Sequence, residues 1–124
     1  MKTQVKICGL MRPEDIACAI EAGADYLGFI VECPSKRRLS VAQAASLAPI
    51  DLPIPSVAVT VNPNDQLIDH ILEHMRPDFI QLHGDETPER AAEIARRVKI
   101  IKAVGISSNE DMNCLLYTSP SPRD

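Results

Sequence analysis

Strand-like and helix-like segments alternate along this chain almost without exception, and this alternation restricts the possible folds more than any other feature. Short β-branched runs predict strands, and each leads through a turn into a segment whose apolar spacing is typical of a helix. The expected strands are Gln4–Cys8, Tyr26–Val31, Ser56–Val61, Phe79–Leu82 and Lys99–Val104. Five consecutive βα units predict an α/β fold with parallel strands.

Local signals predict where the helices between these strands begin and end. Pro13 lies in a first helical turn, and Gly23 follows the last turn of the same helix. Ser40 and Gln43 have the spacing of a capping box, and Thr87 is an expected N-cap. The expected helices are Pro13–Ala22, Ser40–Ala48, a helix from Asn64 to near His74, Pro88–Arg97, and a fifth that opens at Ser107.

The faces of the strands favour a closed barrel over an open sheet. Residues i and i+2 of a strand share a face, so we expect one apolar face toward the helices, which holds Leu27, Phe29, Val57, Val59 and Ile101. The opposite face is polar and holds Lys6, Cys8, Gln81, His83 and Lys102. A sheet covered on both faces reads as apolar throughout, whereas a barrel interior can be polar at the rim where the strands end. The pattern therefore predicts a barrel with a functional mouth.

The composition excludes several classes of function. A net charge of −4 leaves no basic surface for nucleic acid, and no polybasic cluster points to a membrane. No apolar run approaches the roughly 18–20 residues of a transmembrane helix, and the first residues do not resemble a signal peptide. The four cysteines have neither CxxC spacing nor the pattern of a disulfide framework or zinc site. Free thiols without an export signal predict a cytoplasmic protein.

Cys8 ends the first expected strand on the polar face, two residues after Lys6. A free cysteine in a strand is most often a small buried apolar residue. The alternative is a thiolate that acts as a base or nucleophile and is stabilised by a nearby cation. Lys6 and the backbone N–H groups that follow Cys8 could supply that field. The residues alone leave both interpretations open.

Two further candidates follow the second and fourth strands. His83 ends the fourth strand on the polar face, either as a hydrogen-bonded structural group or as part of a site. The run Ser35-Lys36-Arg37-Arg38 lies in a loop at the same rim. An arginine there can hold a carboxylate or phosphate through its planar fork.

Other cysteines and histidines have weaker settings. Cys18 has core spacing in a helix and Cys33 lies in a loop, so we expect neither to take part in chemistry. His70 and His74 are four residues apart, which is metal-ligand spacing, but no third ligand is suggested. A solvated helix face is the better interpretation of this pair.

Taken together, several motifs resemble a known family. They are KICGL at the first strand, GADYLGFI at the second, SKRRLS after it, FIQLHGDE at the fourth and IIKAVGIS at the fifth. In this order and spacing they are similar to N-(5'-phosphoribosyl)anthranilate isomerase, the Amadori-rearrangement enzyme of tryptophan biosynthesis. The resemblance implies a (β/α)₈ TIM barrel that uses no metal and no organic cofactor, and whose partner is a small phosphosugar substrate.

The resemblance also implies roles for single residues. The cysteine of the KICG motif is the general base of the family and falls on Cys8. The arginine that holds the anthranilate carboxylate falls on Arg37, with Arg38 as the shifted alternative. We assign Lys6 and His83, on the same face as Cys8, to substrate binding.

The family is longer than this chain. Its general acid follows the sixth strand and its phosphate site follows the seventh and eighth, so both are absent here. We expect residues 1–113 to form a partial barrel of about five βα units, inactive alone, and residues 114–124 to be a non-native tail. Other readings are a barrel of the indole-glycerol-phosphate synthase or ribulose-phosphate epimerase type, and a non-catalytic α/β binding module.

Overall fold

The computed structural model describes residues 3–33, 35–48 and 52–103. The fifth helix expected from Ser107 and the tail expected at 114–124 lie outside these residues. A single parallel sheet has the strand order β1-β2-β3-β4-β5, which is the order of the sequence. Its strands are β1 (Lys6–Ile7), β2 (Tyr26–Ile30), β3 (Ser56–Thr60), β4 (Phe79–Leu82) and β5 (Lys99–Lys102). Each strand therefore pairs with its neighbour in the chain, as in a barrel wall.

The helices begin where the sequence predicts them. Ser40 and Gln43 form both hydrogen bonds of the expected capping box, and the Thr87 hydroxyl accepts from the backbone N–H of Arg90. The helices are α1 (Pro13–Glu21), α2 (Val41–Leu47), α3 (Asp65–His70) and α4 (Pro88–Ala95), and α3 continues into the π-helical turn η1 (Ile71–Met75). Arg76, in the left-handed region at φ 51°, ends that turn.

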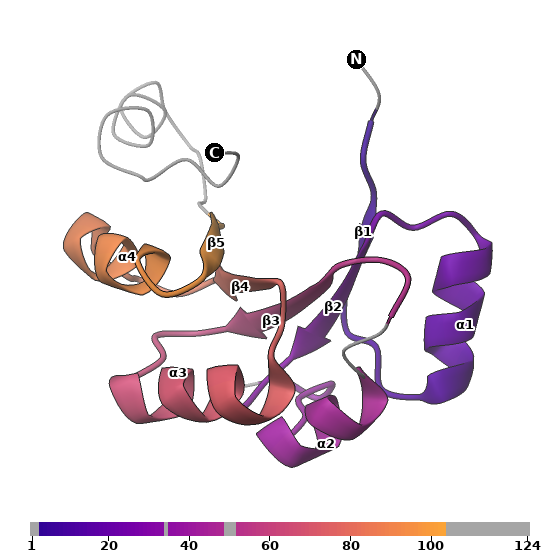
Figure 1. Ribbon diagram of the computed structural model, residues 1–124, viewed down its shortest axis with the longest axis horizontal. Coiled ribbons are helices and arrows are strands. Elements are labelled where there is room, and N and C mark those ends of the chain that lie inside the picture. Colours follow the sequence, from indigo (N-terminus) through magenta and orange to yellow (C-terminus); the bar gives the residue numbers. More distant parts are fainter. Residues whose placement is uncertain (1–2, 34, 49–51, 104–124) are drawn as a thin grey trace.

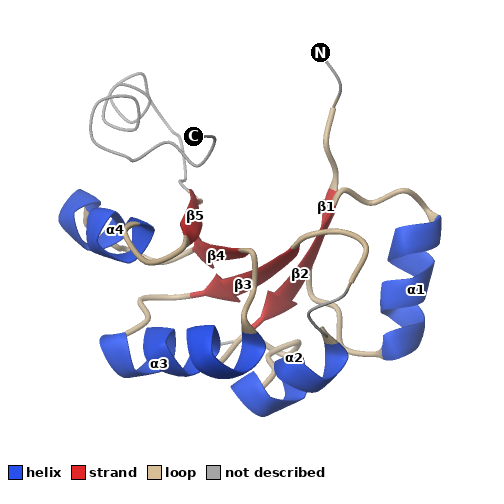
Figure 2. Ribbon diagram, viewed as in Figure 1, coloured by secondary structure: helices blue, strands red, loops and turns tan. Residues whose placement is uncertain are grey.

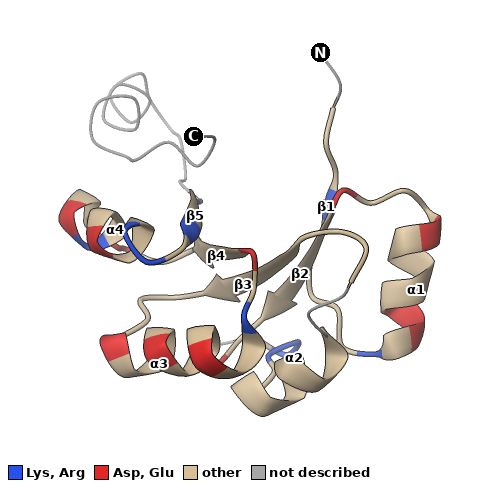
Figure 3. Cartoon of the chain, viewed as in Figure 1, with Lys and Arg blue, Asp and Glu red and all other residues tan. Residues whose placement is uncertain are grey.

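All four labelled helices lie on the convex side of a curved sheet (Figure 1). In Figure 2 no described helix covers the concave side. The main core lies between the sheet and these helices, where Leu27 and Phe29 pack with Ile68 and Ile71, all fully buried. Acidic residues lie in helices α1, α3 and α4 (Figure 3), and Arg90 and Arg97 of the α4 region pair with acidic residues of α3. None of the described helices is long and apolar enough to cross a membrane.

The concave face holds a second, smaller apolar cluster, which corrects two of the expected strand faces. Val57 and Val59 were expected toward the helices, but they pack on the concave face with Ile30 and Cys33. Ala58 and Thr60 take the helix side of β3 instead. Both faces of β3 are apolar enough to be buried, so alternation alone could not orient this strand.

β5 is reversed in the same way. Ile100 pairs with Ile80 and lies in the helix-side core, whereas Ile101 packs in the concave cluster. Lys102 pairs with Leu82, so it lies on the helix side and not on the polar inner face expected for it. The assignments for β1, β2 and β4 agree with the structure.

β1 is shorter than expected because Gly9, at φ 78°, ends it after two residues. Its outer face is apolar and exposed: Val5 is 47% and Ile7 40% accessible. Together with α1 these side chains line an open groove of about 550 Å³. Cys18 also lines this groove and is exposed, so the expectation that it faces the core from its helix is wrong.

Candidate active site

Cys8 lies at the carboxyl end of β1, on the concave face. It is half-buried and packs against the concave cluster, directly over Gly28 of β2. A Cβ atom built on Gly28 would lie 2.8 Å from the Cys8 Sγ atom, closer than real Cβ contacts allow. The thiol therefore occupies space that exists only because the neighbouring strand carries no side chain there.

Arg37 reaches the same place from the loop after β2. The base of this loop is closed by Leu39 N–H to Ile30 O (2.7 Å) and Glu32 N–H to Leu39 O (2.9 Å). The Arg37 guanidinium lies against the Cα of Gly9, where a Cβ atom would be 2.7 Å from Cζ. Gly9 is needed twice, for its positive φ and for this close approach. Arg37 is thus held beside the residue that follows Cys8.

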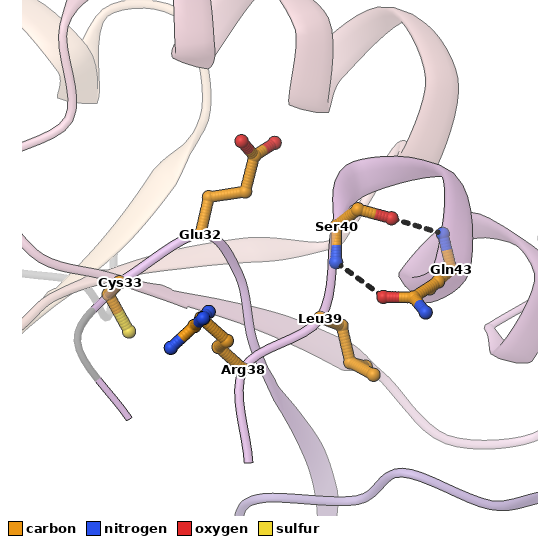
Figure 4. A pocket seen from close by; sticks show the side chains of 6 residues that line it. All are labelled: Glu32, Cys33, Arg38, Leu39, Ser40 and Gln43. Carbon is orange, nitrogen blue, oxygen red and sulfur yellow. Dashed lines mark hydrogen bonds between the residues drawn. The ribbon is translucent and has the colours of Figure 1, made fainter. Parts of the chain in front are cut away.

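Arg38 turns to a different cavity. A pocket of about 730 Å³ lies beside the same loop and is lined by Glu32, Cys33, Arg38, Leu39, Ser40 and Gln43 (Figure 4). Burial raises the pKa of the Cys33 thiol, and the charge of Arg38 offsets part of that rise. A raised pKa disfavours the reactive thiolate form of Cys33.

His83 follows the last residue of β4 and is exposed at the rim. Its backbone N–H donates to Thr60 O (2.8 Å), which fixes the position of the strand end. Its Nδ1 atom lies 3.4 Å from Nε2 of Gln81, two residues earlier on the same face. Since neighbouring strands are about 4.8 Å apart, His83 stands across the mouth from Cys8, roughly 14 Å away along the sheet.

A polar network that the sequence analysis missed joins the ends of β3, β4 and β5. The Glu86 carboxylate, whose side chain is 1% exposed, accepts from Lys102 Nζ (2.7 Å), Asn62 N–H (2.8 Å) and Gly84 N–H (3.0 Å). Burial acts to raise the pKa of Glu86, but the Lys102 ammonium and the backbone donors outweigh it and lower this pKa. This network could not be predicted from the sequence, because Lys102 was expected on the concave face.

Lys6 lies on the concave face, about 6.6 Å below Cys8 by the rise of a strand. Within the described ranges its ammonium makes no hydrogen bond or ion pair. The role of Lys6 in substrate binding stays a prediction.

His70 and His74 stack edge to face on the exposed side of α3 and η1, with ring centroids 4.5 Å apart. The described residues contain no group of three or more side chains able to hold a metal.

The rim thus presents a thiol, a guanidinium and an imidazole from β1, the β2 loop and β4. The thiolate form of a cysteine can take a proton from carbon, and a guanidinium can hold a carboxylate through two parallel hydrogen bonds. The set suits a small anionic ligand.

A family model described as N-(5'-phosphoribosyl)anthranilate (PRA) isomerase matches residues 5–119, which is most of the chain. The chain belongs to this family. Membership sets aside the synthase and epimerase readings and confirms the barrel: the described strands are the first five of its parallel wall.

Curated relatives agree. The N-(5'-phosphoribosyl)anthranilate isomerase of Parvibaculum lavamentivorans is 46% identical over 114 residues, which cover 90% of this chain and 53% of the relative. That of Caulobacter vibrioides is 46% identical over 112 residues, 87% of this chain and 51% of the relative. The chain spans about half the length of the curated relatives it matches.

Solved structures agree as well. A crystal structure of phosphoribosylanthranilate isomerase from Thermotoga maritima superposes with a TM-score of 0.85 at 37% identity, over 93% of this chain and 60% of that one. Another structure of the enzyme, with a TM-score of 0.84 and the same identity and coverage, is a complex with reduced 1-(o-carboxyphenylamino)-1-deoxyribulose 5-phosphate.

Proposed function

We propose that this chain supplies the base-bearing half of a phosphoribosylanthranilate isomerase site. The reaction is the Amadori rearrangement of N-(5-phospho-β-D-ribosyl)anthranilate to 1-(2-carboxyphenylamino)-1-deoxy-D-ribulose 5-phosphate. The observation that carries the proposal is the Cys8 thiol lying over bare Gly28, with the Arg37 guanidinium against Gly9. This proximity supports Cys8 as the base and Arg37 as the neighbouring carboxylate-binding group.

In this proposal the substrate's ribose ring first opens to a protonated Schiff base. The Cys8 thiolate then takes the proton from C2', and the C–H electron pair forms a C1'–C2' double bond while the iminium nitrogen accepts the displaced pair. The resulting enol-amine becomes the ketone product by proton transfer. The rearrangement is redox-neutral overall, and the family resemblance implies that it uses no metal and no organic cofactor.

Arg37 holds the anthranilate carboxylate in this account, and Arg38 does not. The support is positional, because Arg37 lies against Gly9 whereas Arg38 lines the pocket of Cys33. His83 and Lys6 contact the rest of the substrate from the same concave face.

The general acid and the phosphate-binding loops of the family belong to units beyond the fifth strand. We therefore propose that residues 1–113 are a partial barrel, that residues 114–124 are a non-native tail, and that the enzyme works in the cytoplasm.

The test uses a barrel made by joining residues 1–103 of this chain to the remainder of the Parvibaculum lavamentivorans relative, called the joined barrel below. Cys8→Ser should lower its kcat at least about 100-fold, within the usual contribution of a general base. Cys18→Ser is the matched control, because Cys18 is exposed on the outer side of the fold and should leave kcat unchanged. Turnover is followed by the loss of substrate fluorescence. Equal effects from the two substitutions would contradict the assignment.

A further inference from the structure

Gln81 is a buried amide among apolar neighbours. It lies on the concave face between Val59 of β3 and Ile101 of β5, its partners in register, and is 7% exposed. Among the described residues its Oε1 atom is buried without any hydrogen-bond partner. A buried polar group left in this state calls for an explanation.

Among the described residues, the one polar contact of this side chain is with His83. Gln81 Nε2 lies 3.4 Å from His83 Nδ1, and both side chains project from the same face of one strand. The backbone holds them there, because the Thr60 hydroxyl donates to Gln81 O (2.9 Å) and His83 N–H donates to Thr60 O (2.8 Å). The amide and the imidazole ring are therefore fixed neighbours at the mouth of the barrel.

We propose that Gln81 is a positioning residue that sets the tautomer of His83. The amide N–H donates to Nδ1, so the neutral ring carries its proton on Nε2, on the edge directed away from Gln81. This inference rests on the proposed function and deepens it: His83 offers the substrate a hydrogen-bond donor toward an oxygen or anionic group. A ring in this form has no free basic nitrogen toward the mouth, which leaves proton abstraction to Cys8.

The opposite orientation of the Gln81 amide would give the opposite tautomer of His83, so an experiment can distinguish the two arrangements. If Oε1 faced the ring, Nδ1 would carry the proton and Nε2 would be a bare acceptor able to compete with Cys8 as a base. A glutamate at position 81 can only accept a hydrogen bond, so it should impose this second form. Gln81→Leu removes both options.

Long-range ¹H–¹⁵N spectra of the labelled chain at about pH 8, where an ordinary histidine is neutral, report which ring nitrogen holds the proton. The spectrum of His83→Asn assigns the His83 signals against those of His70 and His74. In the parent chain we expect one tautomer for His83, with the proton on Nε2. In Gln81→Glu the proton should move to Nδ1. In Gln81→Leu we expect a mixture of the two tautomers, like that of His70 and His74. Gln66→Glu, which adds the same charge on the exposed side of α3, should leave His83 unchanged.

The joined barrel provides a second sample in which the concave face is enclosed. The proposal is overturned if His83 shows the same mixture as His70 and His74 in both samples, or if Gln81→Glu leaves the proton on Nε2. Neither readout depends on turnover. An inactive joined barrel with the expected tautomer would count against the proposed function and not against this inference.

Discussion

Single side chains determine the proposed chemistry of this rim. The contact between the Cys8 thiol and Gly28 leaves little space for a substitution. Gly28→Ala should push the thiol out of place, since the added carbon would lie 2.8 Å from Sγ. A displacement near 1 Å can cost about 100-fold in rate, so we expect kcat of the joined barrel to fall by roughly ten- to a hundredfold. Thermal melting checks that the fold is kept. A folded variant with undiminished kcat would show that the thiol position is not critical.

Arg37 and Arg38 give a second test at the same level. Lysine keeps the charge of either residue and loses the planar fork that binds a carboxylate with two hydrogen bonds. Arg37→Lys should raise KM for the substrate about tenfold, the cost of roughly 1.4 kcal/mol for one charge-assisted hydrogen bond. Arg38→Lys should have little effect, since Arg38 lines the neighbouring pocket. The reverse order of effects would move the carboxylate site to Arg38.

Sequence reasoning reached some of these residues and not others, for physical reasons. The positions of Cys8 and His83 at strand ends on the concave face could be predicted, because strand alternation and strand ends are local properties. The contacts of Gly28 with Cys8 and of Gly9 with Arg37 join segments far apart in the chain. A single sequence shows a glycine at each place but not the side chain that needs its space.

Among the elements, the ends of β3, β4 and β5 are joined through one buried carboxylate. Glu86→Gln leaves Lys102 without its charged partner, and breaking a buried pair typically costs about 3 kcal/mol. We expect a loss of this size in the free energy of unfolding at pH 7, measured by urea denaturation of the joined barrel. Asp65→Asn is the control, because the Asp65 side chain is 77% exposed in its pair with Arg90; it should cost no more than about 1 kcal/mol.

The pH dependence follows from the sign of the Glu86 shift. Its pKa is lower in the folded state than in the unfolded chain, where a glutamate titrates near about 4.3. The pair therefore stabilises the fold fully above that value, and the contribution is lost as the pH falls through the lower folded pKa. The difference between the parent and Glu86→Gln should shrink as the pH falls below about 4. A constant difference at all pH values would contradict this role for Glu86.

The elements also show where patterns fail. The helix starts at α2 and α4 were predicted correctly because their caps are local hydrogen bonds. The faces of β3 and β5 were not predicted correctly. All five residues of β3 are buried, and β5 has two adjacent isoleucines with a lysine at each end, so neither strand shows which face is inner. Pairing with β2 and β4 decides these orientations, and that information lies outside each strand.

The molecule as a whole is a wall of five strands whose concave side holds the predicted chemistry. The described part of the sheet leaves the outer edges of β1 and β5 unpaired, and Val5 and Ile7 are exposed beside α1. The order of the five units could be predicted because each is a local repeat of strand, turn and helix. The units that close the family barrel could not be predicted from this chain, because it spans about half the length of its relatives.

The most direct test of the account is the rate at which phosphoribosylanthranilate is consumed by the joined barrel and by the 124-residue chain alone. We expect turnover by the joined barrel, because Cys8, Arg37 and His83 of this chain would then face a general acid and a phosphate site. We expect no turnover by the chain alone. A joined barrel that melts cooperatively and yet shows no turnover would contradict the claim that this chain carries the base-bearing half of the site.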